Sequence, residues 1–479
     1  MRREASWEIS GRMHLRQDPQ SDRVYLVRDP DYRERRGERW LLVWSDVPHW
    51  TAVDNDLHEL LSKMDGRRSL DDILAAHPAW APMRADILAA ISAMEPSGVV
   101  RSASAGLVRK IAAAPQPVPI ENIALNITRR CNLRCKFCYN QGFPEPDAEN
   151  ELSASEIWQF LRGLKRLLGN KPSLTVLGGE PLLRPEELLE VCARARRAGL
   201  STLVATNGTL VTDSFARQAA MIGLQVQVSL DGHNAELHDA VRGQGTFDRT
   251  LEGIRTLVSR NVHTIVSMVC HTGNLPHLEE FYDLALSLGV NEARFIPLKQ
   301  IGGGADGEFA PVSMTEMMRT SFGLFKRRPE LLKLAGRDAF SIIASTCSYS
   351  LPKKSCGTGL QTFLLDSDGS IYPCLNTNLP EFRLGSIREP GFDFQTMWQQ
   401  LAMLGNYRKQ TAVSEAGGAC SGCIVRHWCV GGCRGETYVT TGCIDGRSPG
   451  CSDLRDAIIE MMWMISERPD VVKSTNTAC

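Results

Sequence analysis

Residues 123–138 read IALNITRRCNLRCKFC, an apolar stretch followed by three cysteines within eight residues. The first five residues have the short apolar run of a buried strand, so the cysteines lie on a loop that leaves its end. Cysteine thiolates hold iron–sulfur clusters, and four of them saturate a cubane cluster. Cys131, Cys135 and Cys138 would leave one iron open to an external ligand. The spacing alone also admits a zinc site or a plain electron-transfer cluster, although structural zinc takes four ligands and this loop has no fourth Cys or His.

The chain around this loop alternates between strand and helix patterns from residue 120 to about 300. Predicted helices span residues 153–168, 185–198 and 247–259, and predicted strands span 123–127, 173–177, 201–206, 225–230, 263–269 and 293–297. Six such units predict an α/β fold, a partial (β/α)6 TIM-like barrel with a parallel sheet wrapped by helices. Function in such barrels sits at the carboxyl ends of the strands. The cysteine loop, Gly178, Asn207 and Asp231 all fall at such ends.

The regions before and after the barrel differ from it in composition and in predicted secondary structure. Residues 1–104 predict a small winged-helix-like α+β domain, with strands at 23–27 and 39–44 joined by a charged, solvated hairpin loop at 33–38 and helices at 55–64, 69–76 and 82–94. We predict a Pro-rich linker at 105–120, the barrel at 121–310, a helical bridge at 311–345, a Cys-rich domain at 346–455, and a helix and tail at 456–479. The Cys-rich domain has few regular elements, so metal clusters would have to order it.

Composition narrows the class of protein. The chain has 479 residues, 43% of them hydrophobic, and a formal net charge of −1, which argues against nucleic-acid binding. It shows neither an apolar run long enough to span a membrane nor a secretion signal, so we expect a cytoplasmic protein. Clustered cysteines in that compartment are metal ligands more often than disulfides. Of the fifteen cysteines, Cys192 and Cys270 lie in apolar patterns typical of buried structural thiols, and Cys479 ends a polar tail.

The cysteine loop, with Phe137 before its last cysteine and Tyr139 after it, resembles the signature of the radical S-adenosylmethionine (SAM) superfamily. Further segments resemble motifs of this family in the same order. The resemblance implies that the GGEP turn would receive the SAM amino group, that Arg242 would meet the SAM carboxylate, and that other positions would line the pocket. The residues that the resemblance assigns to SAM are Phe137, Tyr139, Gly178, Gly179, Glu180, Pro181, Asn207, Ser229, Asp231 and Arg242. A planar guanidinium suits a carboxylate. The resemblance implies that an electron from a donor such as flavodoxin or ferredoxin cleaves SAM, and that the resulting 5′-deoxyadenosyl radical abstracts a hydrogen atom. It leaves the catalytic residues that act on the substrate unassigned.

A second field of cysteines consists of Cys420, Cys423, Cys429, Cys433 and Cys451, with Cys356 and Cys374 ahead of them. This pattern resembles the SPASM extension of radical SAM enzymes, which holds two auxiliary 4Fe–4S clusters and brings the expected total to three. By position, the distal cluster would take Cys420, Cys423, Cys429 and Cys451, and the proximal cluster would take Cys356, Cys374 and Cys433. Either Cys347 is the fourth proximal ligand or that site is open to substrate. Cys443 has no matching role. A zinc ribbon is the alternative for the CxxC pair alone. Leu375 stands where sulfatase-maturing members have a catalytic aspartate, so we do not expect formylglycine formation.

The front unit resembles the PqqD-like peptide-recognition element of ribosomal-peptide maturases, a domain similar to the pyrroloquinoline-quinone chaperone. Such an element binds a leader peptide as an added edge strand, and a winged-helix-like packing domain is the alternative. These resemblances predict a maturase that modifies a precursor peptide or protein by a thioether, a carbon–carbon or carbon–oxygen cross-link, or an epimerisation. Two other functions stay open: a radical SAM enzyme for a small molecule or tetrapyrrole, and a non-catalytic iron–sulfur protein.

Overall fold

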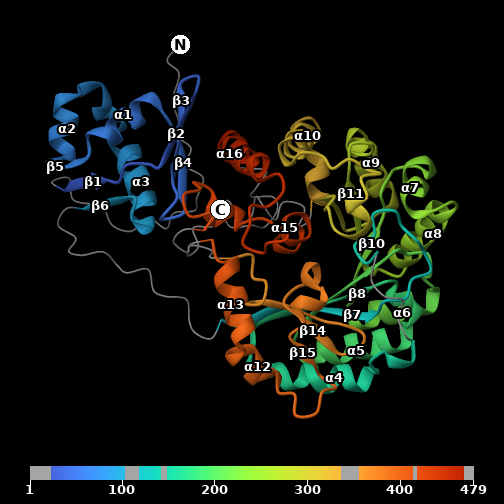
Figure 1. Ribbon diagram of the computed structural model, residues 1–479. Coiled ribbons are helices and arrows are strands. Elements are labelled where there is room, and N and C mark those ends of the chain that lie inside the picture. The colour runs from blue at the N-terminus through green and yellow to red at the C-terminus, as the bar shows by residue number, and fades with distance from the viewer. Residues whose placement is uncertain (1–22, 103–117, 142–147, 336–354, 414–417, 469–479) are drawn as a thin grey trace.

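The computed structural model describes residues 23–102, 118–141, 148–335, 355–413 and 418–468 (Figure 1). Its largest feature is a twisted sheet whose six parallel strands follow one another in sequence order. These strands are β7 (Ile120–Thr128), β8 (Leu168–Gly178), β9 (Ser201–Thr206), β10 (Gln225–Ser229), β11 (His263–Cys270) and β12 (Glu292–Pro297). Each overlaps a predicted strand, so the predicted partial barrel is confirmed. Parallel strands need long crossover connections, and helices supply them here.

The crossover helices cover the outer face of this sheet (Figure 1). They are α4 (Ala154–Gly163), α5 (Pro185–Arg197), α6 (Asp213–Ile222), α7 (Ala235–Arg242), α8 (Thr246–Ser259) and α9 (Leu278–Leu288). Their ends follow local chemistry. Ser153 and Glu156 form a capping box at the start of α4. Gly223 and Gly289 end α6 and α9 in the left-handed conformation that glycine adopts without strain.

The Cys-rich region continues the same sheet beyond β7. Strand β13 (Thr362–Leu365) lies parallel to β7, and β14 (Ser370–Tyr372) and β15 (Gly385–Ser386) follow in antiparallel order, giving nine strands. Its described helices are α12 (Phe394–Gln400), α13 (Ala402–Thr411), α14 (Arg426–Cys429), α15 (Arg434–Thr441) and α16 (Cys451–Glu467), and α10 (Met314–Arg327) precedes it. Helix α16 packs on α10 and on the front unit. Helix α16 is the C-terminal helix, and it begins at Cys451, inside the segment predicted as Cys-rich.

The front unit contains two separate three-stranded sheets. One is β2 (Tyr32–Arg36), β3 (Arg39–Trp44) and β4 (His49–Asp54), and the other is β5 (Asp65–Ser69), β1 (Val24–Val27) and β6 (Val100–Ser102). The helices are α1 (Asn55–Lys63), α2 (Leu70–Ala76) and α3 (Arg84–Met94), close to their predicted ranges. The predicted charged hairpin loop at 33–38 is wrong, because most of it is strand β2 and only Gly37 and Glu38 form the turn. A strand at a sheet edge tolerates such charges because they project into solvent.

One face of the β2–β3–β4 sheet packs in the core of the front unit, and the other face packs in the main core of the protein. Leu42 and Trp44 of β3 belong to the core of the front unit, whereas Leu41 and Val43 belong to the main core with α16. Side chains on a strand alternate between faces, so one strand serves both cores. No helix in the described ranges is long and apolar enough to cross a membrane.

Candidate functional site

The end of strand β8 packs directly against the start of the cysteine loop. The Gly179 amide donates to the Thr128 carbonyl at 2.8 Å, and the Glu180 amide donates to the Arg130 carbonyl at 2.8 Å. A Cβ atom on Gly178 would lie 2.0 Å from the Thr128 oxygen, and one on Gly179 would lie 2.1 Å from the Arg130 oxygen. Only glycine permits this approach of two backbones. The two glycines of the GGEP turn therefore fix where the cysteine loop leaves the sheet.

Glu180 ties β8 to β9. Its carboxylate is fully buried and accepts hydrogen bonds from the Thr206 hydroxyl at 2.7 Å, the Asn207 amide at 2.8 Å and the Leu182 amide at 2.9 Å. Burial raises the pKa of Glu180, and these donors partly offset that rise. The carboxylate thus joins the GGEP turn to the carboxyl end of β9. Pro181 is buried at the start of the turn that follows.

Asn207 joins the carboxyl end of β9 to the cysteine loop. The side-chain nitrogen of Asn207 donates to the Asn132 side-chain oxygen at 2.9 Å, and the side-chain oxygen of Asn207 accepts from the Thr209 backbone amide at 2.9 Å. Asn132, inside the cysteine loop, was not among the predicted site residues. The sequence carried no separate signal for it, because its partner comes from a strand more than seventy residues away.

The three cysteines of the first loop lie together, half-buried and free of disulfides. Burial raises the pKa of the Cys131 thiol and raises that of Cys135 to about 11, and charge repulsion among Cys131, Cys135 and Cys138 adds to both shifts. Three thiolates this close are stabilised by a positively charged metal centre. No group of three or more Cys, His, Asp or Glu residues in the described segments is placed to hold a single metal ion. The donor set of three soft thiols fits an iron–sulfur cluster with an open iron.

Arg242 and Asp231 form a buried ion pair beside this loop. The Arg242 Nε donates to Asp231 Oδ2 at 2.5 Å, and its Nη1 lies 3.8 Å from the Cys135 sulfur. Asp231 is fully buried and also accepts from the Val269 amide at 2.9 Å. Burial alone would lower the pKa of Arg242, but Asp231 and Cys135 raise it overall. Arg242 is therefore held at the cysteine loop, with one edge of its guanidinium committed to Asp231.

The remaining predicted positions line the same end of the sheet. Phe137 is buried in a small apolar cluster with Val241 and Leu298, and its ring meets that of Phe309 edge-on at 5.9 Å. The Tyr139 hydroxyl donates to the Gly178 carbonyl at 3.4 Å. Ser229 ends strand β10 and is half-buried. These aromatic side chains keep water from one side of the cysteine loop.

The second field of cysteines forms two groups. Cys356, Cys374 and Cys433 lie near one another and near Lys299, a residue that the sequence analysis did not single out. Burial and, to a smaller extent, the neighbouring thiols raise the pKa of Cys374 to about 11, and Lys299 offsets part of the rise.

The other group contains the four cysteines predicted for the distal cluster. Burial raises the pKa of Cys423, with contributions from Cys451 and Cys420, and burial raises that of Cys429 to about 11, with contributions from Cys420 and Cys423. Cys356 of the proximal group is exposed, and so is Cys443, which has no predicted role. Cys192 and Cys270 are buried, and Cys347 and Cys479 lie outside the described residues.

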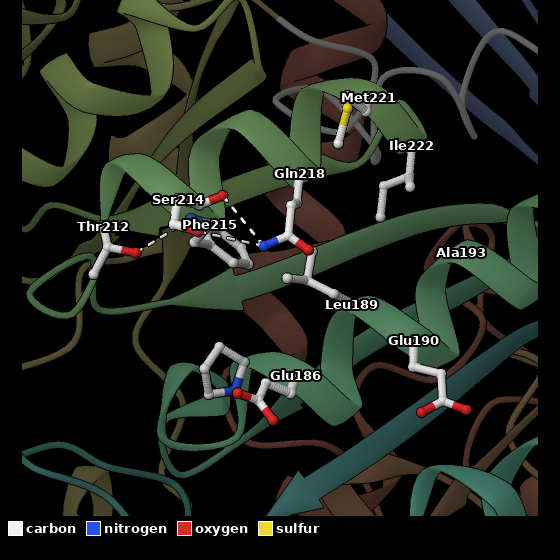
Figure 2. A pocket seen from close by; sticks show the side chains of 11 residues that line it. Glu186, Leu189, Glu190, Ala193, Thr212, Ser214, Phe215, Gln218, Met221 and Ile222 are labelled. Carbon is white, nitrogen blue, oxygen red and sulfur yellow. Dashed lines mark hydrogen bonds between the residues drawn. The ribbon is translucent and has the colours of Figure 1, made fainter.

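A groove of about 460 Å³ lies elsewhere, between helices α5 and α6 (Figure 2). Leu189, Phe215, Met221 and Ile222 supply its apolar lining, and Glu186 and Glu190 supply its charges. It contains none of the predicted site residues. Helices α5 and α6 belong to the layer outside the sheet (Figure 1), so this groove lies away from the strand ends that carry the predicted site residues.

The chain is similar to known proteins both in a family model and in whole sequences. Residues 125–285 match the family model of the radical SAM superfamily. The chain is 30% identical over 345 residues to an AdoMet-dependent heme synthase of Methanosarcina barkeri, covering 69% of this chain and 95% of that protein. It is also 30% identical over 333 residues to the mycofactocin maturase MftC of Mycolicibacterium smegmatis, covering 68% of this chain and 81% of that protein.

Two solved structures have a similar fold. Native anSMEcpe with bound AdoMet superposes with a TM-score of 0.59 at 18% identity, covering 75% of this chain and 100% of that one. Streptococcus suis SuiB bound to S-adenosylmethionine superposes with a TM-score of 0.55 at 14% identity, covering 90% of this chain and 99% of that one. The second match extends over more of this chain than the first.

A parallel half-barrel that carries three clustered thiols at the end of its first strand defines an iron–sulfur enzyme that works with SAM. The chain belongs to the radical SAM superfamily. It is accordingly an oxidoreductase-type enzyme that uses SAM and a 4Fe–4S cluster.

Proposed function

We propose that this protein is a radical SAM–SPASM maturase that oxidatively modifies a precursor peptide or protein. The observation that carries the proposal is the open edge of the front unit. In the described part of the chain, β2 pairs with β3 alone, so its outer backbone edge is available for another strand. Strand addition supplies affinity through main-chain hydrogen bonds. Among the similar proteins, MftC is a maturase and SuiB has been solved with its precursor peptide SuiA.

The charge of β2 indicates what kind of peptide it would bind. Its sequence is YRERR, and the side chains of Arg33, Arg35 and Arg36 are exposed. Arg36 pairs with Glu460 of α16 at 3.0 Å. Arg33 pairs with the exposed Asp29 at 2.9 Å and Arg35 donates to the Gly37 carbonyl at 2.9 Å, and both side chains stay exposed enough to meet a partner. Opposite charges across a strand pair stabilise the pairing. The proposed ligand is therefore a leader peptide with acidic residues in its extended segment.

At the reaction centre, Cys131, Cys135 and Cys138 would hold the SAM-binding cluster. Bound SAM supplies the 5′-deoxyadenosyl radical that abstracts hydrogen from an unactivated carbon. The chain's own residues hold the geometry and exclude water: Gly178 and Gly179 set the loop position, and Phe137 packs over one side. Because Arg242 lies at Cys135 and pairs with Asp231, its proposed contact with the SAM carboxylate would use its remaining Nη groups.

We further propose that the Cys-rich region holds two auxiliary 4Fe–4S clusters. The distal one would take the four sulfur atoms of Cys420, Cys423, Cys429 and Cys451, and the proximal one those of Cys356, Cys374 and Cys433. The mutual charge effects among the thiols support this grouping. Four thiolates saturate a cubane, so the distal cluster would be closed. The proximal cluster would either stay open or take Cys347 as its fourth ligand.

The test is an anaerobic assay of reconstituted protein with SAM, a low-potential reductant such as reduced flavodoxin, and candidate precursor peptides. Deoxyadenosine formed together with a change in peptide mass, or with deuterium uptake by the peptide, is the expected result. Peptide affinity is measured in parallel for the Arg33→Glu/Arg35→Glu double variant. It should bind an acidic leader at least tenfold more weakly than wild type, while Arg67→Glu, a change at an exposed arginine on β5, should leave binding unchanged.

A second candidate function is the modification of a tetrapyrrole, which the similarity to the Methanosarcina barkeri heme synthase favours. The same assay separates the two candidates when haem precursors replace the peptides. Deoxyadenosine and product formed with a tetrapyrrole, without any change in peptide mass or deuterium content, would replace the peptide proposal. A protein that carries its clusters and forms no deoxyadenosine with either substrate class would contradict both.

A further inference from the structure

The loop that follows β12, residues 298–304, packs against the first cysteine loop. The Gly303 amide donates to the Cys138 carbonyl at 2.9 Å. A Cβ atom on Gly302 would lie 2.5 Å from that same oxygen, so the backbones touch with no space for a side chain. Leu298 packs against Phe137. One side of the 298–304 loop is therefore part of the SAM-binding end of the sheet.

The other side of the same loop reaches the Cys-rich region. The Gln300 amide donates to Glu436 Oε1 of α15 at 2.9 Å. The Lys299 ammonium lies within charge range of the sulfur of Cys433, the residue before α15, and of the sulfurs of Cys374 and Cys356. The Asn376 side-chain amide also donates to the Cys433 sulfur, at 3.4 Å. Lys299, from the loop that follows β12 of the barrel, is thus a cation beside the three predicted proximal ligands.

A cation fixed beside cluster sulfurs has a defined electrostatic effect. Net charge and hydrogen bonds to the sulfurs are among the factors that set the reduction potential of an iron–sulfur cluster. When such a cluster accepts one electron, its core becomes more negative by one unit, and a nearby ammonium stabilises that state by Coulomb attraction. The carboxylate of Glu436, which also acts on Lys299, opposes this effect.

We propose that Lys299 is a positioning residue that raises the reduction potential of the cluster held by Cys356, Cys374 and Cys433, and that the 298–304 loop fixes this cluster relative to the SAM-binding one. The inference rests on the auxiliary clusters of the proposed function. The proposal adds a residue from outside the Cys-rich region that affects the reduction potential of this cluster. It also means that one short loop contacts both cysteine sites.

The experiment is a potentiometric titration of the reconstituted protein with dithionite, followed by electron paramagnetic resonance, with iron content measured on every sample. The variants are Lys299→Gln, Lys299→Arg and Glu436→Gln, and the control is Lys333→Gln, an exposed lysine in the turn at Pro329–Leu334. In Lys299→Gln, reduction of one auxiliary cluster should become about tenfold less favourable, a shift of ~59 mV for one electron. Lys299→Arg, which keeps the charge, should restore most of the shift.

Glu436→Gln keeps an acceptor for the Gln300 amide and removes the opposing charge, so the potential of the same cluster should rise. This second variant decides the question even where Lys299→Gln loses iron. Full iron content with unchanged potentials in both Lys299→Gln and Glu436→Gln would overturn the role of Lys299, as would an unchanged potential in Glu436→Gln when Lys299→Gln has lost iron. Wild-type protein with iron for only one cluster would instead overturn the auxiliary clusters themselves, a failure that the iron measurement alone identifies.

Discussion

Replacing Gly179 with alanine adds one methyl group where β8 meets the cysteine loop. The new Cβ would lie 2.1 Å from the Arg130 carbonyl oxygen and 2.5 Å from that of Arg129, whereas a relaxed carbon–oxygen contact is about 3.3 Å. The loop backbone would have to move by roughly 1 Å to relieve the overlap, which costs about 1–3 kcal/mol as overpacking does elsewhere. Such a movement would also strain the 2.8 Å bond from the Glu180 amide to Arg130.

The expected result is a protein that folds but assembles its first cluster poorly. Gly179→Ala should lose the iron and sulfide of one cluster and most of its SAM affinity, and its free energy of unfolding should fall by about 1–3 kcal/mol. The matched control is Gly163→Ala at the end of α4, where no atom lies within 4 Å of the new Cβ. This control should keep its iron and gain up to ~1 kcal/mol, since alanine is the better helix former. Gly179→Ala with wild-type iron content and SAM affinity would refute the reasoning.

Three further predictions follow from buried and interdomain charges. Arg242→Met leaves the buried Asp231 carboxylate unpaired and should cost about 3–5 kcal/mol in urea unfolding; an Arg242→Met/Asp231→Asn variant that fails to recover stability would contradict this account. Burial lowers the pKa of His49 to about 4 from its ordinary 6.5, so the unfolded chain takes up the proton first and stability falls by about 3 kcal/mol as the pH drops from about 6.5 to 4. The same pH loss in His49→Asn, measured by urea unfolding, would show that another group is responsible. Arg426, between Cys423 and Cys429, pairs with Asp46 of the front unit. Because Asp46 is half exposed, Arg426→Gln should cost at most ~1 kcal/mol, seen as up to about fivefold faster hydrogen exchange in β3 and β4; unchanged exchange would show that the pair does not hold the two parts together.

Much of the barrel could be predicted because its signals are local. The strand Ser201–Thr206 and the helix that begins at the capping box of Ser153 and Glu156 are where the sequence predicts them, since apolar periodicity and cap chemistry act within a few residues. The charged strand β2 could not be predicted in this way. Its residues read as a solvated loop, and only pairing with the apolar β3 makes them a strand.

The site can likewise be divided into features that the sequence predicts and features that depend on tertiary contacts. The sequence alone determined where three thiol donors lie, because the spacing of Cys131, Cys135 and Cys138 on a loop after a buried strand places them at one edge of a parallel sheet. The type of centre was predicted from the resemblance of this loop to the radical SAM signature. Tertiary structure alone decided what surrounds them: Glu180 turns its carboxylate to β9, Arg242 lies beside Cys135, and Lys299 reaches Cys433. The physical reason is the separation of the partners along the chain. The spacing within a loop is set by consecutive residues, whereas contacts between residues 26 to more than a hundred positions apart exist only after the sheet has brought its strand ends together.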